Sequence, residues 1–182
     1  MNIFTETERQ DLLSCLHIGR DTFLKAVAGL SEEQCSVRST PECWTIRECV
    51  EHVASVEKLM FRALEKAPVT GAYANPSRDQ SIRHSMLDRK QKLMAPEISR
   101  PSARFSRTDE AIDFFKQNRE QVIAFVERNQ DDLRQRSLDH PLLGPIDGYQ
   151  ALLVLALHPQ RHAEQIEEIK ACSGFRRLVA AS

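Results

Sequence analysis

The stretch from Ala151 to Lys170, ALLVLALHPQRHAEQIEEIK, places the strongest constraint on the fold of this chain. Its first half is apolar on every side of a helix, which is the pattern of a helix buried in the centre of a domain. Its second half is amphipathic. His158 and His162 lie four residues apart near this change, so a helix would carry both imidazoles on one inward face. The sequence therefore predicts a buried helix that carries a pair of histidines near its more polar end.

Two neutral imidazoles one helical turn apart form a natural chelate for a borderline divalent metal, with zinc and nickel as the first candidates. The alternative is a pair of core histidines that are satisfied by hydrogen bonds, and a third ligand would separate the two hypotheses. Pro159 follows His158 inside the predicted helix and removes the hydrogen bond to the Leu155 carbonyl. Unrelieved, this costs about 3 kcal/mol. We expect a kink that leaves His162 one turn away, and the alternative is a helix break that destroys the site.

Composition restricts the classes of protein to which the chain can belong. Its 182 residues suffice for one domain with a sizeable core, and we assign residues 1–182 to a single domain. The net charge is −1 and no strongly basic face is evident, which argues against a nucleic-acid-binding protein. No apolar run approaches the length of a membrane span. The five cysteines are scattered without a CxxC pair, which favours reduced thiols in a cytoplasmic protein.

Four segments combine a helix start signal with apolar residues at helical spacing. They predict long helices at roughly 5–29, 45–66, 109–131 and 148–172. The first two begin with capping boxes, in which a threonine and the glutamate three residues later satisfy each other's backbone groups. Residues 67–107 are irregular, with one modest helix expected near 79–94. A connection of this length permits the second and third helices to run parallel. The expected fold is therefore an all-α four-helix bundle with a long crossover between helices 2 and 3.

The second helix contributes a third histidine. His52 falls within its apolar stripe, and a buried histidine needs a partner, so it is either a structural core residue or a metal ligand. Cys49 lies one turn earlier, and we interpret it as a packing residue rather than a fourth ligand. Glu57 lies at the other margin of the stripe, where we expect it to be solvated. The alternative is that Glu57 supports a ligand or transfers a proton. His140, in the connection before the last helix, is expected to be solvated unless it approaches the mouth of a site.

Together these motifs resemble the DinB/YfiT-like superfamily of metal-dependent proteins. The resemblance is carried by Trp44-Thr45 before a capped helix, His52 within it, HPLLGPI before the last helix, and RHAEQIEEI at residues 161–169. It implies a four-helix bundle with a three-histidine site for a divalent metal, and the ligands correspond to His52, His158 and His162. The better-understood relatives are transferases that attach small thiols such as bacillithiol or mycothiol to small electrophiles. The resemblance also implies a homodimer.

Two kinds of function follow from these residues. An open metal centre would bind a thiol, lower its pKa and deliver the thiolate to an electrophile, and the same centre could activate water for hydrolysis. Alternatively, the chain is a stress-responsive bundle in which metal or histidines support only structure or a partner interface. A structural metal site has a fourth protein ligand, whereas a catalytic one keeps a position facing a cleft. The sequence offers no obvious fourth ligand, which favours the enzyme.

Overall fold

Four long helices form an elongated bundle in the computed structural model, which describes residues 4–70, 75–90 and 93–180. They are α1 (Glu6–Val27), α3 (Ile46–Lys66), α5 (Thr108–Arg128) and α6 (Gly148–Lys170). Each bound lies within three residues of its prediction. The capping boxes predicted at Thr5 and Thr45 are present, and the pattern from Asp147 to Gln150 also forms one at the start of α6. The all-α four-helix bundle predicted from the sequence is therefore confirmed.

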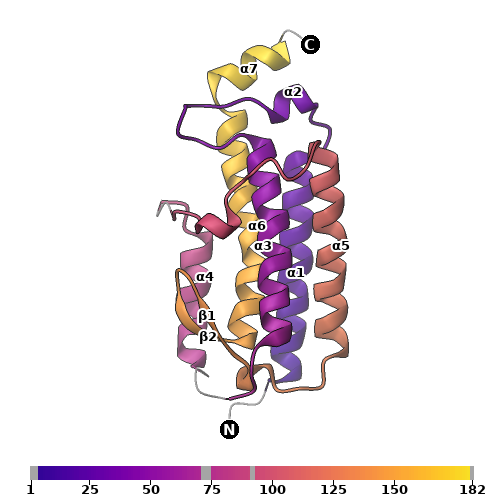
Figure 1. Ribbon diagram of the computed structural model, residues 1–182, viewed down its shortest axis with the longest axis vertical. Helices are drawn as coiled ribbons and strands as arrows, with labels where there is room; N and C mark the ends of the chain where they lie inside the picture. The colour runs from indigo at the N-terminus through magenta and orange to yellow at the C-terminus, as the bar shows by residue number, and fades with distance from the viewer. Residues whose placement is uncertain (1–3, 71–74, 91–92, 181–182) are drawn as a thin grey trace.

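The four helices run in two parallel pairs (Figure 1). α1 and α6 share one direction, and α3 and α5 share the opposite one. α1 packs against α5 and α6, and α3 packs against the same two helices, so the bundle closes around a common core. The parallel course of α3 and α5 requires the long crossover between them, whose length permitted this arrangement.

The remaining elements are short. They are α2 (Glu32–Cys35), η1 (Pro76–Arg78), α4 (Asp79–Leu87), η2 (Glu97–Ser99), η3 (Leu133–Gln135), β1 (Ser137–His140), β2 (Gly144–Asp147) and α7 (Ser173–Ala180). The last predicted helix ends near residue 172, and no helix was predicted where α7 forms. Phe175 explains the difference, because its side chain is 6% exposed and packs into the core beside the end of α6.

α4 ends at Leu87, earlier than the predicted 79–94, and residues 91–92 of that prediction lie outside the described residues. The guanidinium of Arg161 on α6 donates to three carbonyl oxygens at this end of α4, most closely to that of Asp88 at 2.7 Å. The last carbonyls of a helix have no donor within the helix. Arg161 satisfies them from outside and thereby attaches the crossover to α6.

The connection before α6 contains a β-hairpin that the sequence pattern did not predict. β1 and β2 pair antiparallel, with Ser137 opposite Asp147 and His140 opposite Gly144. Gly144 has a φ of 68°, a conformation that favours glycine. The Nδ1 atom of His140 accepts two backbone N–H groups of the turn, each at 3.2 Å. Strands of four residues show too few alternations for a period of two to stand out in the sequence.

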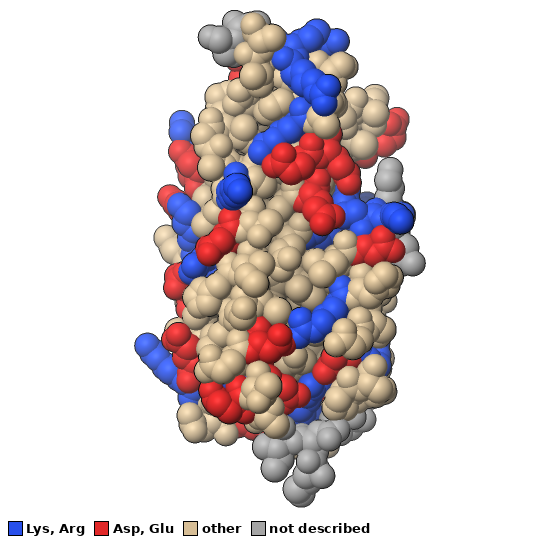
Figure 2. Space-filling view, turned by 180° about the vertical axis from the view of Figure 1, so that it is seen from behind, with Lys and Arg blue, Asp and Glu red and all other residues tan. Residues whose placement is uncertain are grey.

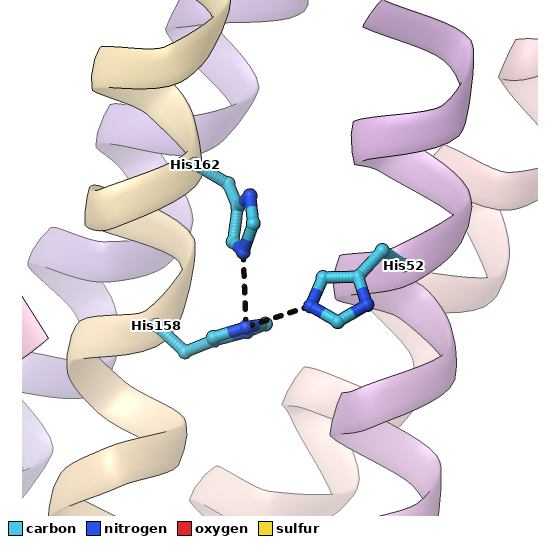
Figure 3. Close-up of side chains that lie close together, drawn as sticks. All are labelled: His52, His158 and His162. Atoms are coloured by element: carbon cyan, nitrogen blue, oxygen red, sulfur yellow. Dashed lines mark hydrogen bonds between the residues drawn. The ribbon is translucent and has the colours of Figure 1, made fainter. Parts of the chain in front are cut away.

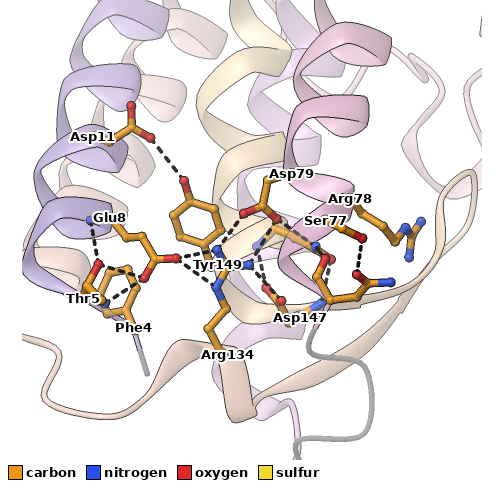
Figure 4. Close-up of polar contacts among 12 residues, drawn as sticks. Phe4, Thr5, Glu8, Asp11, Ser77, Arg78, Asp79, Arg134, Asp147 and Tyr149 are labelled. Atoms are coloured by element: carbon orange, nitrogen blue, oxygen red, sulfur yellow. Dashed lines mark hydrogen bonds and ion pairs between the residues drawn. The ribbon is translucent and has the colours of Figure 1, made fainter. Parts of the chain in front are cut away.

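A cluster around Arg134 holds the end of the bundle where α1 and α6 begin (Figure 4). Its guanidinium is 1% exposed and donates to the carboxylates of Glu8 at 2.6 Å, Asp79 at 2.7 Å and Asp147 at 3.0 Å. It also lies 4.0 Å from the centre of the Tyr149 ring. Burial raises the pKa of the Asp147 carboxyl, and the charge of Arg134 opposes that rise. The cluster fixes α1, α4 and α6 to one another, so it also positions the crossover.

The surface carries both signs of charge. On the face seen in Figure 2, basic and acidic side chains are interspersed around an uncharged strip. Within the described residues, none of the helices combines the length and the apolar character needed to cross a bilayer.

The apolar core is divided at mid-height by a layer of polar side chains. One cluster of the core lies toward the start of α6 and includes Leu16, Phe61, Val122 and Leu152. The other lies toward its end and includes Phe23, Val53, Phe115 and Ile166. The positions between them are occupied by polar residues of α3, α5 and α6, namely His52, Glu57, Arg119, His158 and His162. The candidate site belongs to this layer.

Candidate metal centre

The three predicted ligands converge on one point between α3 and α6 (Figure 3). The Nε2 atom of His158 lies 3.1 Å from the Nε2 atoms of both His52 and His162. The side chains are buried, with 5%, 9% and 6% exposure for His52, His158 and His162 respectively. Their ligand atoms all lie within 4.8 Å of one another. The structure therefore brings together the histidine of α3 and the pair of α6.

In two of the three rings, a hydrogen bond to the outer nitrogen fixes which atom carries the proton. The Nδ1 atom of His52 lies 2.7 Å from the carbonyl oxygen of Ser99, and that of His162 lies 2.9 Å from Oε1 of Gln165. Because these oxygens can only accept, both Nδ1 atoms donate, and a neutral ring then carries a lone pair on Nε2. At least two lone pairs thus face the same point. Such an arrangement suits a cation and is unfavourable without one.

The environment keeps these rings uncharged. Burial lowers the pKa of His52, and burial together with the neighbouring histidines lowers the pKa of His158 well below its usual value. Burial likewise lowers the pKa of His162 strongly, while its bond to Gln165 opposes the shift. Neutral imidazole is the form that binds metal, so the site is in its ligand form at neutral pH.

The residues fit a divalent metal of the zinc type. Two nitrogens that each lie about 2.05 Å from a tetrahedral ion are roughly 3.3 Å apart. Two of the three nitrogen pairs are close to this separation, at 3.1 Å, and all three atoms lie within 4.8 Å of one another. Among the residues that the structure describes, no cysteine or carboxylate joins the three histidines as a fourth ligand. All three histidines line a cavity of about 1050 Å³. Three protein ligands and access to a cavity are the arrangement of catalytic rather than structural zinc sites.

Pro159 does not break the helix. α6 is continuous from Gly148 to Lys170, so the hypothesis that proline destroys the site is wrong, while the expected kink stays a prediction. The carbonyl of Leu155, which loses its usual donor to the proline, accepts instead from Nη2 of Arg119 at 2.8 Å. Arg119 on α5 is fully buried. Its guanidinium therefore replaces the hydrogen bond that Pro159 removes, one turn before the paired histidines.

Glu57 is buried, and the prediction that it is solvated was wrong. The carboxylate is 2% exposed and receives two hydrogen bonds from Arg119, at 2.7 and 2.9 Å. Burial raises the pKa of the Glu57 carboxyl, and the charge of Arg119 opposes the rise. Arg119 lies four residues after Phe115 and three before Val122, on the apolar face of α5. An arginine within an apolar stripe is a sequence signal for burial, and it could have indicated that Arg119 needs a buried acidic partner.

The other candidate residues also have defined places. Cys49 is buried in the core, as predicted, and burial raises the pKa of its thiol. His140 is half-buried and lines the cavity, so the alternative that it approaches the site applies. The Trp44 ring stacks on His162, with ring centres 6.2 Å apart and planes at 17°, and its centre lies 4.8 Å from that of His52. Trp44 thus forms a wall of the site.

Residues of the crossover support His52 from outside, and the sequence did not reveal them. Ser99 receives the hydrogen bond of His52. Glu51, which is 4% exposed, accepts the backbone N–H groups of Ser102 at 2.7 Å and Arg104 at 3.2 Å. Adjacent residues of α3 therefore hold the crossover against the site. No local pattern marks such loop positions, because their role depends on a segment some fifty residues away.

We expect the stability of the metal-free protein to fall as the pH decreases below about 6.5. The unfolded histidines titrate near 6.5, whereas burial lowers the folded pKa of all three ligands. The unfolded chain then binds more protons, so the stability is present above 6.5 and is lost below it, by up to about 1.4 kcal/mol per pH unit for each histidine. Urea denaturation between pH 7 and pH 5 measures this slope.

The matched variants for this pH experiment are His162→Gln in the site and His84→Gln on the exposed side of α4. The first variant should reduce the slope, and the second should leave it as it is in the parent protein. Equal slopes in all three proteins would contradict the buried, neutral histidines.

Comparisons with known proteins show the family and the fold of the chain. A sequence profile of the DinB superfamily matches residues 16–166. The protein YuaE of Bacillus subtilis (strain 168) is 25% identical over 146 residues, which cover 78% of this chain and 86% of YuaE. The structure of YfiT from Bacillus subtilis, described as a probable metal-dependent hydrolase with an unusual four-helix bundle topology, matches with a TM-score of 0.60 and 14% identity, covering 98% of this chain and 91% of YfiT.

At 14% identity, the likeness to YfiT shows a shared fold and nothing about the reaction. The sequence profile is the stronger finding, because it spans most of the chain and includes all three histidines. The chain belongs to the DinB superfamily.

Proposed function

We propose that the protein is a metal-dependent enzyme that transfers a small cytoplasmic thiol to a small electrophile. The observation that carries the proposal is the convergence of three buried imidazoles, with no fourth protein ligand among the described residues, on a cavity of about 1050 Å³. Drug-sized ligands occupy pockets of about 300–1000 Å³, so this space suits two small reactants together.

The chain's own residues would act mainly by positioning. His52, His158 and His162 would hold the divalent ion, zinc or nickel, which supplies the charge that ionises a bound thiol near neutral pH. Ser99 and Gln165 keep the lone pairs of His52 and His162 directed inward. The aromatic wall of Trp44 and the surrounding burial exclude water from the thiolate. Cys49 is in the core, and no cysteine joins the three histidines among the described residues, so in this proposal the nucleophile comes from the substrate.

We expect turnover that needs both a metal and a thiol. The assay supplies bacillithiol, mycothiol, glutathione or cysteine together with monochlorobimane, whose fluorescence rises when the thiolate sulfur displaces chloride. Activity should disappear with a chelator and return with added zinc or nickel. His162→Ala should lose activity, while His84→Ala on the exposed face of α4 serves as the matched control. A loaded site that accelerates none of these thiols would overturn the proposal.

Hydrolysis is the second candidate. It is favoured by the description of YfiT as a probable metal-dependent hydrolase and by the ability of such a centre to activate water. This candidate would be favoured if the protein cleaves an ester or amide in a metal-dependent reaction but transfers none of the thiols. If the protein binds metal and shows neither reaction with these substrates, a role in structure or in a partner interface becomes the better hypothesis.

A further inference from the structure

The cavity at the histidines has two chemically different ends. α3 and α6 run in opposite directions, so the part of α3 that follows His52 lies beside the part of α6 that precedes His158. The cavity residues of these two segments are Val56, Leu59, Met60, Ala63 and Val154. All five are apolar. We call this region the apolar end of the cavity.

The β-hairpin and α4 contribute to the same end. Leu138 and Leu143 of the hairpin and Met60 of α3 are partly buried against the main core, and Met86 of α4 is 5% exposed. Polar groups reach this end from the hairpin, where Asp139 and His140 line the cavity. The imidazole of His140 is already engaged by two backbone N–H groups. The apolar end is thus walled by aliphatic and thioether side chains on several sides.

Polar residues gather at the opposite end of the cavity. Past His162 on α6, the lining residues are Gln165, Glu168 and the apolar Ile169. Glu168 accepts two hydrogen bonds from Arg89, at 2.7 and 3.3 Å. Glu42 lies on this side as well, in the segment that precedes α3. The three histidines therefore lie between an apolar end and a mixed end that carries charged groups.

The apolar end is long enough to select for chain length. His52 and Ala63 are eleven residues apart on one helix, which corresponds to roughly 16 Å. An unbranched aliphatic chain could lie along this length and exchange water for apolar contacts at each methylene. Burying one methylene typically strengthens binding by about fourfold.

We propose that the apolar end binds a long aliphatic group of the substrate. The polar part of the substrate then points toward Arg89 and Glu168, and the reacting atom lies beside the histidines. The position of the reacting atom rests on the proposed function, whereas the binding of the aliphatic chain does not require a metal. The substrate class is therefore an amphiphile with a reactive group near its polar end.

The first test measures binding of straight-chain 1-alkanols, from butanol to decanol, to the metal-free protein by isothermal titration calorimetry. We expect the dissociation constant to fall by about fourfold per added methylene until the apolar end is filled, and then to level off. Absence of binding, or affinity that does not depend on chain length, would overturn the proposal.

A pair of variants shows where the chain lies. Ala63 is exposed and lines the far part of the apolar end, so Ala63→Phe adds a ring there at little cost to folding. The affinity should then level off at a shorter chain, while short alkanols bind as they do to the parent protein. Arg62→Phe adds the same ring to an exposed position of α3 that is not part of the cavity lining. An unchanged limit in Ala63→Phe, or equal shifts in both variants, would refute binding at this end.

The second test connects the chain to the histidines. Straight-chain alkanehydroxamates of increasing length are titrated into zinc-loaded protein, where the hydroxamate group serves as a probe for the metal. The gain per methylene and the effect of Ala63→Phe should match those of the alkanols. Tight binding of acetohydroxamate without any gain for longer chains would overturn the proposal and leave the metal centre intact. Chain-length dependence without thiol transfer would instead refute the proposed reaction and support the aliphatic site.

Discussion

His162→Ala will bind zinc at least about a hundredfold more weakly than the parent protein. Replacement of groups that only orient a ligand typically costs about 10- to 100-fold in metal affinity, and His162 contributes one of the three converging nitrogens itself. Only two imidazoles would then bind the zinc ion, and water would have to replace the third one in its coordination shell. Protein purified without a histidine tag and titrated against a competing chelator gives the affinity.

The chain contains its own reporter for this experiment. Trp44 is the sole tryptophan and stacks on the His162 ring, so nickel binding should quench its fluorescence. Gln165→Leu removes the acceptor that orients His162 and should weaken binding by about 10-fold or more. His84→Ala, on the exposed face of α4, should bind like the parent. If His162→Ala retains the parental affinity, the three histidines are not the metal site.

Features carried by one continuous segment could be predicted from the sequence. The capping boxes of α1 and α3 and the pair His158 and His162 depend on spacings of three or four residues, which a helix converts directly into contacts. The role of His52 as a ligand was harder to predict. Its burial follows from an apolar stripe, but its partners lie on another helix. The family resemblance linked it to the pair, and the 3.1 Å separation agrees with that link.

Features that join distant segments could not be predicted in this way. Glu57 looked solvated because a charge at the margin of an apolar stripe usually reaches water, and its partner is Arg119 on α5. The hydrogen bond between His52 and Ser99 depends on a crossover without regular structure. Composition likewise did not show that the hairpin would wall the cavity beside the histidines. Each of these depends on tertiary packing, which local propensity does not specify.

Arg119→Met will lower the free energy of unfolding by about 3–5 kcal/mol, the usual cost of removing one partner from a buried ion pair. The guanidinium is fully buried and donates to Glu57, to the Leu16 carbonyl at 3.0 Å and to the Leu155 carbonyl at 2.8 Å. Methionine has similar length but no donor, so it leaves a buried carboxylate and carbonyl oxygens unsatisfied. Urea denaturation of the metal-free protein measures the loss. Arg20→Met, which breaks an exposed pair with Glu120, should cost less than about 1 kcal/mol.

A double-mutant cycle tests whether Arg119 compensates for Pro159. Pro159→Ala provides the backbone N–H that can donate to the Leu155 carbonyl, so this oxygen no longer depends on the guanidinium. Pro159→Ala should therefore be more stabilising in the Arg119→Met background than in the parent, with a coupling of about 1 kcal/mol, the net value of one such hydrogen bond. Strict additivity of the two substitutions would show that Arg119 does not support the helix at Pro159. Such support would explain how α6 holds His158 and His162 at the 3.1 Å separation despite a proline between them.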